Sequence, residues 1–299
     1  MPVESIKISV PASSANLGSG YDSLGIAIDL RLNLKASLSQ RDEFIYSGDG
    51  KIPNSANNLI HNSFKEVFKH QLKVAPKIRF EVENPIPLAR GLGSSSAALV
   101  AGIAIADHLL NNKLGRDGVY QIAAKMEGHP DNVGPAVYGG FSSSVKDNND
   151  YFYNQRLDIP KDWKFLFAIP SYHLKTEDAR AVIPKNYRIE DAIYNLSRAS
   201  LWPIAIVKNK PEILKYACQD KIHEPYREKL IPKFLMTKLE LNQAGAYASY
   251  LSGAGPTMGV ICSSYKVREL KKILKKFVGE YGQVIETKPS VRGYRITTE

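Results

Sequence analysis

The spacing of apolar residues predicts a chain in which short strands and helices are mixed. Alternation of apolar and polar residues indicates strands, because successive side chains of a strand point to opposite faces. Apolar residues that recur every three or four positions indicate helices with one buried side. In the first half we expect strands at 5–10, 24–34, 77–82 and 139–144, and helices at 58–72, 95–110 and 117–126.

The second half of the chain continues this mixture. Strands are expected at 163–169 and 259–262, with two further short strands at the end of the chain. A cluster of Asp and Asn at 147–150 changes the local composition and predicts a domain boundary there. Strands and helices interleaved in both halves favour a two-domain α/β or α+β protein. Helices are expected at 176–182, 190–207, 211–218, 232–243 and 266–277.

The length and composition are typical of a globular protein with a large core. The chain has 299 residues, of which 43% are hydrophobic and 23% are charged, and this length suggests roughly two domains. The longest apolar run, 97–106, is too short to span a membrane, and the N-terminus shows no signal peptide. Cys218 and Cys262 are the only cysteines. They predict a reducing, cytoplasmic setting without disulfides or a zinc site.

The chain is basic. Its 40 Lys and Arg residues against 30 Asp and Glu residues give a formal charge of +10, which favours anionic partners without identifying one. The densest basic segment is the predicted helix 266–277, whose apolar residues recur at helical spacing. A surface helix with a solvated cationic side explains this pattern. Binding of nucleic acid or a membrane surface is the alternative, but no aromatic-interleaved motif accompanies it.

A run of small residues at 90–98 is the most informative stretch of the sequence. It reads Arg-Gly-Leu-Gly-Ser-Ser-Ser-Ala-Ala and begins the apolar helix expected at 95–110. A helix start exposes unpaired N–H groups and the positive end of the helix dipole, and glycine lets a ligand approach the backbone closely. This combination favours a polyphosphate ligand, although the glycines could also serve only a tight turn.

Two better-known phosphate motifs do not match this loop. A Walker loop needs Gly-Lys-Ser or Gly-Lys-Thr at the helix start, and no Lys occurs between Arg90 and Leu110. A dinucleotide-binding fingerprint needs a third glycine where Ser96 stands. Any phosphate bound here is therefore bound in another way.

Two further segments of small and polar residues accompany this loop, at 11–22 and 252–257. They read Pro-Ala-Ser-Ser-Ala-Asn-Leu-Gly-Ser-Gly-Tyr-Asp and Ser-Gly-Ala-Gly-Pro-Thr. Together with 87–98 they resemble, in the same order, the three motifs of the GHMP kinases. That superfamily is named after galactokinase, homoserine kinase, mevalonate kinase and phosphomevalonate kinase. The resemblance spans nearly the whole chain.

Within that superfamily the chain most resembles the homoserine kinases. First motifs of the mevalonate and galactokinase type carry a Lys or Arg and a Glu-His pair, where this chain has Ser-Ser-Ala-Asn at 13–16. The segments 127–135, 176–180 and 224–227 also resemble homoserine kinase sequences. One departure is Gly134, where that family usually has Ala.

The resemblance implies ATP-dependent phosphorylation of the L-homoserine hydroxyl to O-phospho-L-homoserine, for threonine synthesis. It implies an α+β fold with a ribosomal-protein-like N-terminal domain, 1–153, a ferredoxin-like C-terminal domain, 154–299, and an active site between them. The expected partners are L-homoserine and MgATP, with no nucleic acid and no membrane, and the family is often homodimeric. The alternatives are another kinase of the superfamily, of shikimate or mevalonate type, or a non-catalytic nucleic-acid-binding protein of the same fold.

Homoserine offers an ammonium, a carboxylate and a hydroxyl, and the chain has candidates for each. Arginine fits the carboxylate because its guanidinium can form two parallel hydrogen bonds, and Asp22 fits the ammonium. Asp131 and Asn132 are the catalytic candidates. Asp131 is either the general base or a group that recognises the ammonium, with Asn132 then orienting the hydroxyl. The expected substrate-binding residues are Asn16, Asp22, His129, Arg180 and Arg227.

The loop and its helix are expected to hold MgATP. Mg²⁺ takes few protein oxygens, commonly from a carboxylate and a hydroxyl, and keeps several waters. By analogy with the family, Glu127 and Ser95 are expected to supply them, and Mg²⁺ and the helix dipole replace the missing lysine. The expected ATP-binding residues are Pro85, Ile86, Pro87, Leu88, Ala89, Arg90, Gly91, Leu92, Gly93, Ser94, Ser95 and Ser96.

Overall fold

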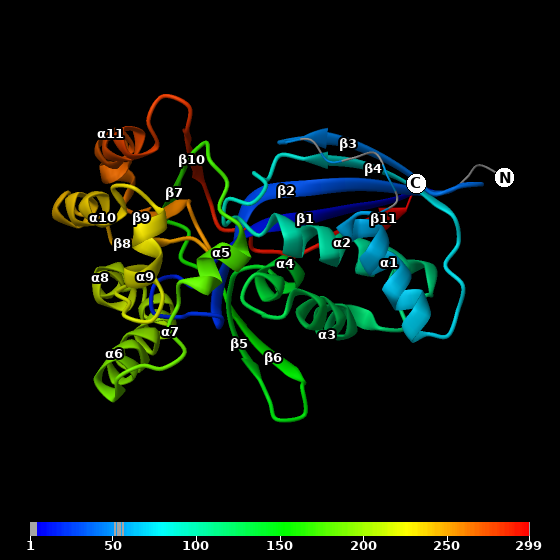
Figure 1. The fold of residues 1–299 in the computed structure, drawn as a ribbon, viewed down its shortest axis with the longest axis horizontal. Coiled ribbons are helices and arrows are strands. Elements are labelled where there is room, and N and C mark those ends of the chain that lie inside the picture. Colours follow the sequence, from blue (N-terminus) through cyan, green and yellow to red (C-terminus); the bar gives the residue numbers. More distant parts are fainter. Residues whose placement is uncertain (1–4, 51, 53–54, 56, 299) are drawn as a thin grey trace.

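The larger of two sheets has seven strands. The computed structural model describes residues 5–50, 52, 55 and 57–298. In this sheet β1 lies between β11 and β2, β4 and β3 follow, and β5 pairs with both β2 and β6 (Figure 1). The strands are β1 (Ile6–Ala15), β2 (Leu24–Leu38), β3 (Glu43–Gly48), β4 (Ile78–Asn84), β5 (Phe141–Lys146), β6 (Phe152–Leu157) and β11 (Arg295–Thr298).

Strand β1 is longer than the sequence pattern predicts. It pairs with β2 in antiparallel fashion over its whole length, with a register shift between Pro11 and Ala12. Residues 11–15 therefore continue the strand, where a loop was expected at 11–22. The alternation of apolar and polar residues stops there because all five side chains are buried. The loop itself is left with residues 16–22.

Four helices cover one face of this sheet (Figure 1). Helix α2 is apolar almost all round, as expected for a helix that is buried on several sides. Helices α1 and α3 pack beside it, and α1 buries Phe64, Val67 and Phe68. The helices are α1 (Leu59–His70), α2 (Ser94–Leu109), α3 (Gly115–Glu127) and α4 (Val133–Tyr138).

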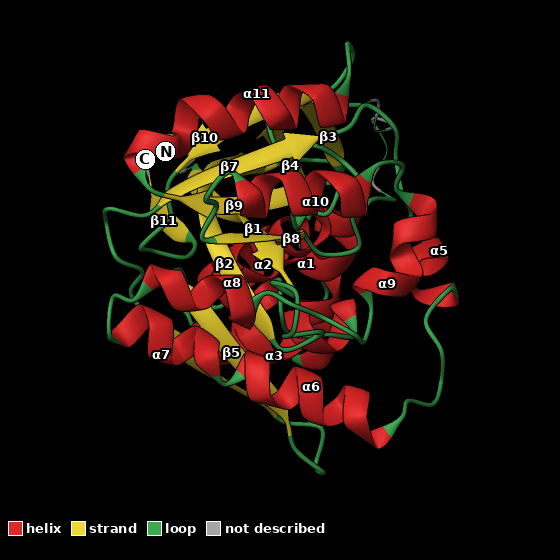
Figure 2. Ribbon diagram, turned by 90° about the vertical axis from the view of Figure 1, so that its left-hand side faces the viewer, coloured by secondary structure: helices red, strands yellow, loops and turns green. Residues whose placement is uncertain are grey.

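The second sheet has four strands in the order β10-β7-β9-β8. Helices α10 and α11 pack in front of it (Figure 2). The basic helix expected at 266–277 is α11, which buries Leu270, Ile273 and Leu274 and pairs Lys271 with Glu286 of β10. These elements are β7 (Lys164–Ile169), β8 (Ala248–Leu251), β9 (Met258–Cys262), β10 (Gln283–Thr287), α10 (Phe234–Gln243) and α11 (Val267–Val278).

The remaining helices of the second half are short. The helix expected at 190–207 is in fact two helices, α6 and α7, separated at Ser200. Pro203, the third residue of α7, lacks an N–H and is tolerated near a helix start, where that group has no partner within the helix. The helices are α5 (Thr176–Ala181), α6 (Ile189–Ala199), α7 (Leu201–Val207), α8 (Leu214–Ala217), α9 (Glu224–Arg227), and the single turns η1 (Pro211–Ile213), η2 (Glu228–Leu230) and η3 (Ser264–Lys266).

The Asp and Asn cluster at 147–150 is a hairpin turn between β5 and β6. The Asp147 carboxylate accepts the backbone N–H groups of Asn149 and Tyr151. Asp and Asn favour tight turns for this reason, so their composition could not distinguish a turn from a linker. The division at 153/154 stays a prediction, and it falls inside β6.

The architecture is mixed α+β with two sheets, as the sequence predicts. The division into two halves is not complete, because the last strand, β11, belongs to the larger sheet. It pairs with β1, with Thr298 opposite Ile6. No helix in the described part of the chain is both long and apolar enough to cross a membrane.

Candidate active site

The three motif segments, the first of which includes the end of β1, meet through direct hydrogen bonds. The Ser13 N–H donates to the Leu92 carbonyl at 3.1 Å, and the Gly253 N–H donates to the Ala15 carbonyl at 3.0 Å. The Ser252 hydroxyl donates to the Gly91 carbonyl at 2.7 Å. The three motif segments, far apart in the sequence, therefore form one unit.

Gly91 and Gly93 allow the loops to approach this closely. Their φ angles of +74° and +69° lie in the left-handed region, which favours glycine. A Cβ at Gly93 would lie 2.0 Å from Oγ of Ser13, and one at Gly91 would lie 2.1 Å from the Ser252 carbonyl oxygen. The glycines thus serve a tight turn and a close contact with the other loops, which is compatible with phosphate binding.

A cavity lies where the loops meet. All the residues expected to bind the substrate line it, and so do Asp131, Asn132, Ser95 and Glu127. Of the remaining residues expected to bind ATP, Pro85, Ile86 and Ser96 line neither this cavity nor the apolar one beside it, and Leu88 lines only the apolar one. The others all line the first cavity: Pro87, Ala89, Arg90, Gly91, Leu92, Gly93 and Ser94.

Helix α2 begins at this cavity. Its N-cap is Gly93, and no side chain caps the first turn. The first N–H groups of the helix are therefore open to a ligand, and the helix dipole favours an anionic one. Arg90 is engaged elsewhere, because its guanidinium binds the Asp49 carboxylate at 2.8 Å and the Ser171 carbonyl at 3.0 Å.

Ser95 and Glu127 face each other across the start of α2. The Ser95 hydroxyl donates to Oε2 of Glu127 at 3.0 Å. Burial raises the pKa of Glu127, although the nearby His129 works in the opposite direction. A cation beside this carboxylate would offset the cost of its burial. A hydroxyl and a carboxylate are oxygen donors of the kind that Mg²⁺ prefers, so the pair fits this ion.

Asp131 lies at the buried end of the cavity, with 1% of its surface exposed. Its Oδ1 contacts Nδ1 of His129 at 2.6 Å and accepts the Asn132 N–H at 2.9 Å. The Asn132 side-chain oxygen accepts the Ser13 hydroxyl at 2.8 Å. Burial opposes the charge of His129, but the hydrogen bond and charge of Asp131 outweigh it and raise the pKa of His129.

Asp22 and Arg180 form an ion pair with each other. Both carboxylate oxygens of Asp22 accept hydrogen bonds from the guanidinium, at 3.0 and 2.8 Å. The Tyr21 hydroxyl accepts a third hydrogen bond from Arg180, at 3.0 Å. The two groups expected to bind opposite charges of the substrate therefore neutralise each other in this structure.

Asp22, His129 and Asp131 also bring three possible metal-ligand atoms within 4.8 Å of one another. Each is already paired, Asp22 with Arg180 and His129 with Asp131. A histidine nitrogen is a poor ligand for Mg²⁺, which prefers oxygen. The pair of Ser95 and Glu127 suits this ion better.

A second, apolar cavity of about 400 Å³ adjoins the first, and sequence reasoning missed it. Ala89, Ser94, Ser95 and Thr176 line both cavities. Its apolar walls come from strands and a helix whose side chains look like ordinary core residues in the sequence. Two further residues of the site were not predicted, although both lie in segments that carried the resemblance. Thr176 lines both cavities, and the Tyr21 hydroxyl accepts a hydrogen bond from Arg180. Phe44, Tyr46, Ile60 and Val82 are among the residues of the apolar wall.

Comparisons with known proteins identify the family of this chain. Residues 58–140 match the family described as GHMP kinases N terminal domain, and residues 206–280 match GHMP kinases C terminal. A homoserine kinase from Thermus thermophilus is 42% identical over 280 residues, which cover 93% of this chain and 94% of the relative. One from Caldanaerobacter subterraneus is 38% identical over 298 residues, covering 98% and 93%.

A solved structure shows the same fold over nearly the whole chain. The homoserine kinase from Cytophaga hutchinsonii superposes with a TM-score of 0.85 at 27% identity, covering 98% of this chain and 97% of that one. The three motif loops, the uncapped start of α2 and the relatives thus agree, and the chain belongs to the homoserine kinases of the GHMP kinase family.

Proposed function

We propose that this chain transfers the γ-phosphoryl group of ATP to the side-chain hydroxyl of L-homoserine, giving O-phospho-L-homoserine. One observation carries the proposal: the uncapped start of α2 opens into a cavity lined by acidic and basic side chains. The helix start suits a polyphosphate and the charged lining suits a small zwitterion. Relatives that span nearly the whole chain bear the name homoserine kinase.

ATP spans the two adjoining cavities in this proposal. The apolar cavity accepts the adenine ring, because its walls include Phe44, Tyr46 and Ile60. The triphosphate then lies over the first turn of α2, where Ser94 and Ser95 belong to both cavities. Backbone N–H groups and the helix dipole provide the positive charge that a lysine supplies in a Walker loop.

Ser95 and Glu127 would hold Mg²⁺ through oxygen. When bound, the ion neutralises charge on the phosphates and helps to align the group that is transferred. The oxygen pair lies beside the helix start that receives the phosphates. Glu127 must be ionised to bind a cation, so its raised pKa makes metal binding weaker at low pH.

The substrate carboxylate is assigned to Arg227 and Arg180, and its ammonium to Asp22. The ion pair between Arg180 and Asp22 must then open. A zwitterion offers each partner the charge that it loses, so no charge is left unpaired in the cavity. His129 and Asn16 provide further polar contacts in the same lining.

Asp131 is assigned to the reacting hydroxyl. Its Oδ1 is already bonded to His129 and Asn132, so Oδ2 is the oxygen that remains for the substrate. Oδ2 orients the hydroxyl oxygen for attack and takes its proton, while Asn132 is fixed by Ser13. Phosphoryl transfer depends mainly on such positioning and on neutralising charge.

The partners in this proposal are L-homoserine and MgATP, and neither nucleic acid nor a membrane takes part. We expect the protein to act in the cytoplasm and, as members of its family often do, to form a homodimer. Sedimentation over a range of protein concentrations tests the dimer.

The experiment that tests the function is a coupled ADP-release assay with L-homoserine, D-homoserine, L-threonine, shikimate and mevalonate. We expect turnover with L-homoserine alone, loss of it on removal of Mg²⁺ with a chelator, and recovery when Mg²⁺ is added back. Turnover of shikimate or mevalonate, which carry a carboxylate but no ammonium group, would identify another substrate and refute the assignment of Asp22. ATP-independent binding of RNA without any turnover would favour the non-catalytic alternative.

A further inference from the structure

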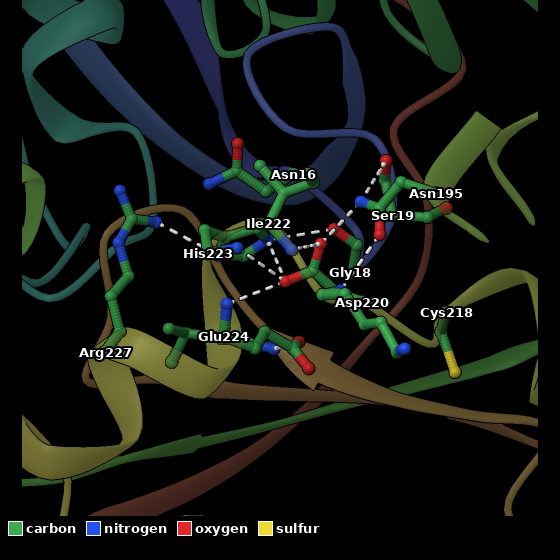
Figure 3. A network of polar contacts seen from close by, with 12 residues as sticks. Asn16, Gly18, Ser19, Asn195, Cys218, Asp220, Ile222, His223, Glu224 and Arg227 are labelled. Atoms are coloured by element: carbon green, nitrogen blue, oxygen red, sulfur yellow. Dashed lines mark hydrogen bonds and ion pairs between the residues drawn. The ribbon is translucent and has the colours of Figure 1, made fainter. Parts of the chain in front are cut away.

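Two buried polar side chains lie to one side of Arg227: His223 contacts it, and Asp220 lies beyond His223 (Figure 3). Both side chains have no exposed surface, and neither lines the cavity that Arg227 lines. Nδ1 of the His223 ring lies 3.2 Å from Nη1 of Arg227, and its Nε2 lies 2.8 Å from the Gly18 carbonyl oxygen. His223 therefore joins the loop at 16–22 to Arg227.

These two neighbours determine where the His223 ring carries its proton. A guanidinium can only donate, so Nδ1 must be the unprotonated, accepting nitrogen. A carbonyl can only accept, so Nε2 must carry the hydrogen. Burial is the main cause that lowers the pKa of His223; Arg227 adds to it, while Asp220 and Glu224 oppose it. The ring is thus neutral, with its hydrogen on Nε2.

The protein holds Arg227 through two of its three nitrogens. Nε donates to the Ala179 carbonyl of α5 at 3.0 Å, and Nη1 donates to the Gly253 carbonyl at 3.0 Å. Nη1 also faces His223, and the residue is only 1% exposed. Nη2 remains as the nitrogen for a ligand in the cavity, and its direction depends on how Nη1 is held.

Asp220 fixes the start of α9, which carries Arg227 and begins directly after His223. Its carboxylate accepts the N–H groups of Ile222, His223 and Glu224 at 3.0, 2.8 and 2.7 Å. It also accepts a hydrogen bond from Nδ2 of Asn195, and the same nitrogen donates to the Ser19 carbonyl. The loop and α9 are thus connected at two points, through Asn195 and through His223 (Figure 3).

We propose that His223 is a positioning residue for the reaction. Its neutral ring, with the hydrogen on Nε2, links the Gly18 carbonyl to Arg227 and orients the guanidinium toward the carboxylate of the amino-acid substrate. The inference rests on the proposed function and adds a residue that makes the site selective for substrates with a carboxylate. The Nδ1 contact with Arg227 is the one that matters for this selectivity.

Two substitutions separate the two ring nitrogens. The amide of asparagine reaches the position of Nδ1 and can still accept from Arg227, whereas the amide of glutamine reaches the position of Nε2 and loses that contact. Each variant is assayed with L-homoserine and with 3-aminopropan-1-ol, which is the same molecule without its carboxylate. The readout is the ratio of the two kcat/KM values.

We expect His223→Gln to lower this ratio by about tenfold, through a higher KM for L-homoserine. The kcat/KM for 3-aminopropan-1-ol should change by no more than about twofold. We expect His223→Asn to keep the ratio within about threefold. The control His61→Gln replaces another buried histidine, in α1, and should leave the ratio unchanged. Equal losses on both substrates in both His223 variants would mean a structural role only and would overturn the proposal.

A second measurement reports on the His223 ring in the unchanged protein. NMR of ¹⁵N-histidine-labelled protein should show one ring, absent from the His223→Asn spectrum, with its hydrogen on Nε2 throughout pH 6–8. A hydrogen on Nδ1 would overturn the proposal. Absence of activity on L-homoserine in the unchanged protein would refute the proposed function, whereas normal activity with an unaltered ratio in His223→Gln would refute this inference alone.

Discussion

Single residues control how closely the three loops of the site approach one another. At Gly93 the left-handed backbone and the 2.0 Å approach of Ser13 Oγ act together. Gly115 has a similar φ of +62° but no atom within 4 Å of a Cβ built on it. The two positions therefore separate the cost of the backbone conformation from the cost of the contact.

We expect Gly115→Ala to lower the free energy of unfolding by about 1 kcal/mol, the cost of a left-handed alanine. Gly93→Ala should cost about 2 kcal/mol more, because Ser13 and its bond to Asn132 must move. Urea unfolding of both variants measures the difference. Equal losses would show that the contact with Ser13 can relax freely.

Asp131 allows a direct test of the two roles left open by its sequence. If Oδ2 takes the proton of the hydroxyl, Asp131→Asn should lower kcat by roughly 10²–10⁴-fold with little change in KM. A change confined to KM would instead assign Asp131 to the ammonium. Steady-state kinetics with saturating MgATP separates the two results, and Asn132→Ala serves as the comparison.

His129 should make stability depend on pH. Its pKa is raised in the folded protein, so its stabilising contribution is fully present below about pH 6.5. That contribution is lost as the pH rises through the raised value. We expect the free energy of unfolding to fall over this range in the unchanged protein, and to fall less in His129→Gln. An identical pH dependence in the two proteins would contradict the role of the pair with Asp131.

The structure gives a reason for Gly134, where the resemblance to the family predicts Ala. A Cβ at this position would lie 2.5 Å from Nδ2 of Asn154, which donates to the Ser144 hydroxyl at 2.8 Å. An alanine at position 134 would displace that polar side chain. The sequence indicated the departure, but its reason required the neighbouring strand.

At the scale of elements, the sequence predicted best those that carry a strong periodic pattern. Helices α2 and α11 lie within one residue of their expected bounds at either end, because a long apolar or amphipathic run has few alternatives. Strands β3, β6 and β8 were missed: exposed side chains leave β3 and β6 little alternation, and β8 is short and fully buried. The motif loops were identified by their composition, whereas the apolar cavity depends on side chains brought together only by the fold.

The hairpin between β5 and β6 gives a test at this scale. Asp147 accepts two backbone N–H groups of the turn, and each such bond contributes about 0.5–1.5 kcal/mol. We expect Asp147→Ala to lower the free energy of unfolding by about 1 kcal/mol and to leave kinase activity unchanged. If residues 147–150 were a linker between domains, Asp147→Ala would not lower the free energy of unfolding. Thermal unfolding of the variant distinguishes a hairpin turn from a linker.

For the whole molecule, the return of β11 to the first sheet joins the end of the chain to its beginning. β11 is the neighbour of β1 on one side. We expect removal of residues 295–299 to lower the free energy of unfolding by about 2–3 kcal/mol, through the lost strand pairing and its packing. An unchanged unfolding midpoint in urea would show that β11 contributes little.

The pairing of β1 with β11 also sets an order of events during synthesis. The ribosome releases β1 early, yet its partner on one side, β11, is made almost 300 residues later. Until then β1 presents a free edge, and such edges invite pairing with other chains. The surroundings of β1 are therefore complete only after residues 295–298 have been made, so a product that stops before them should aggregate through the free edge of β1.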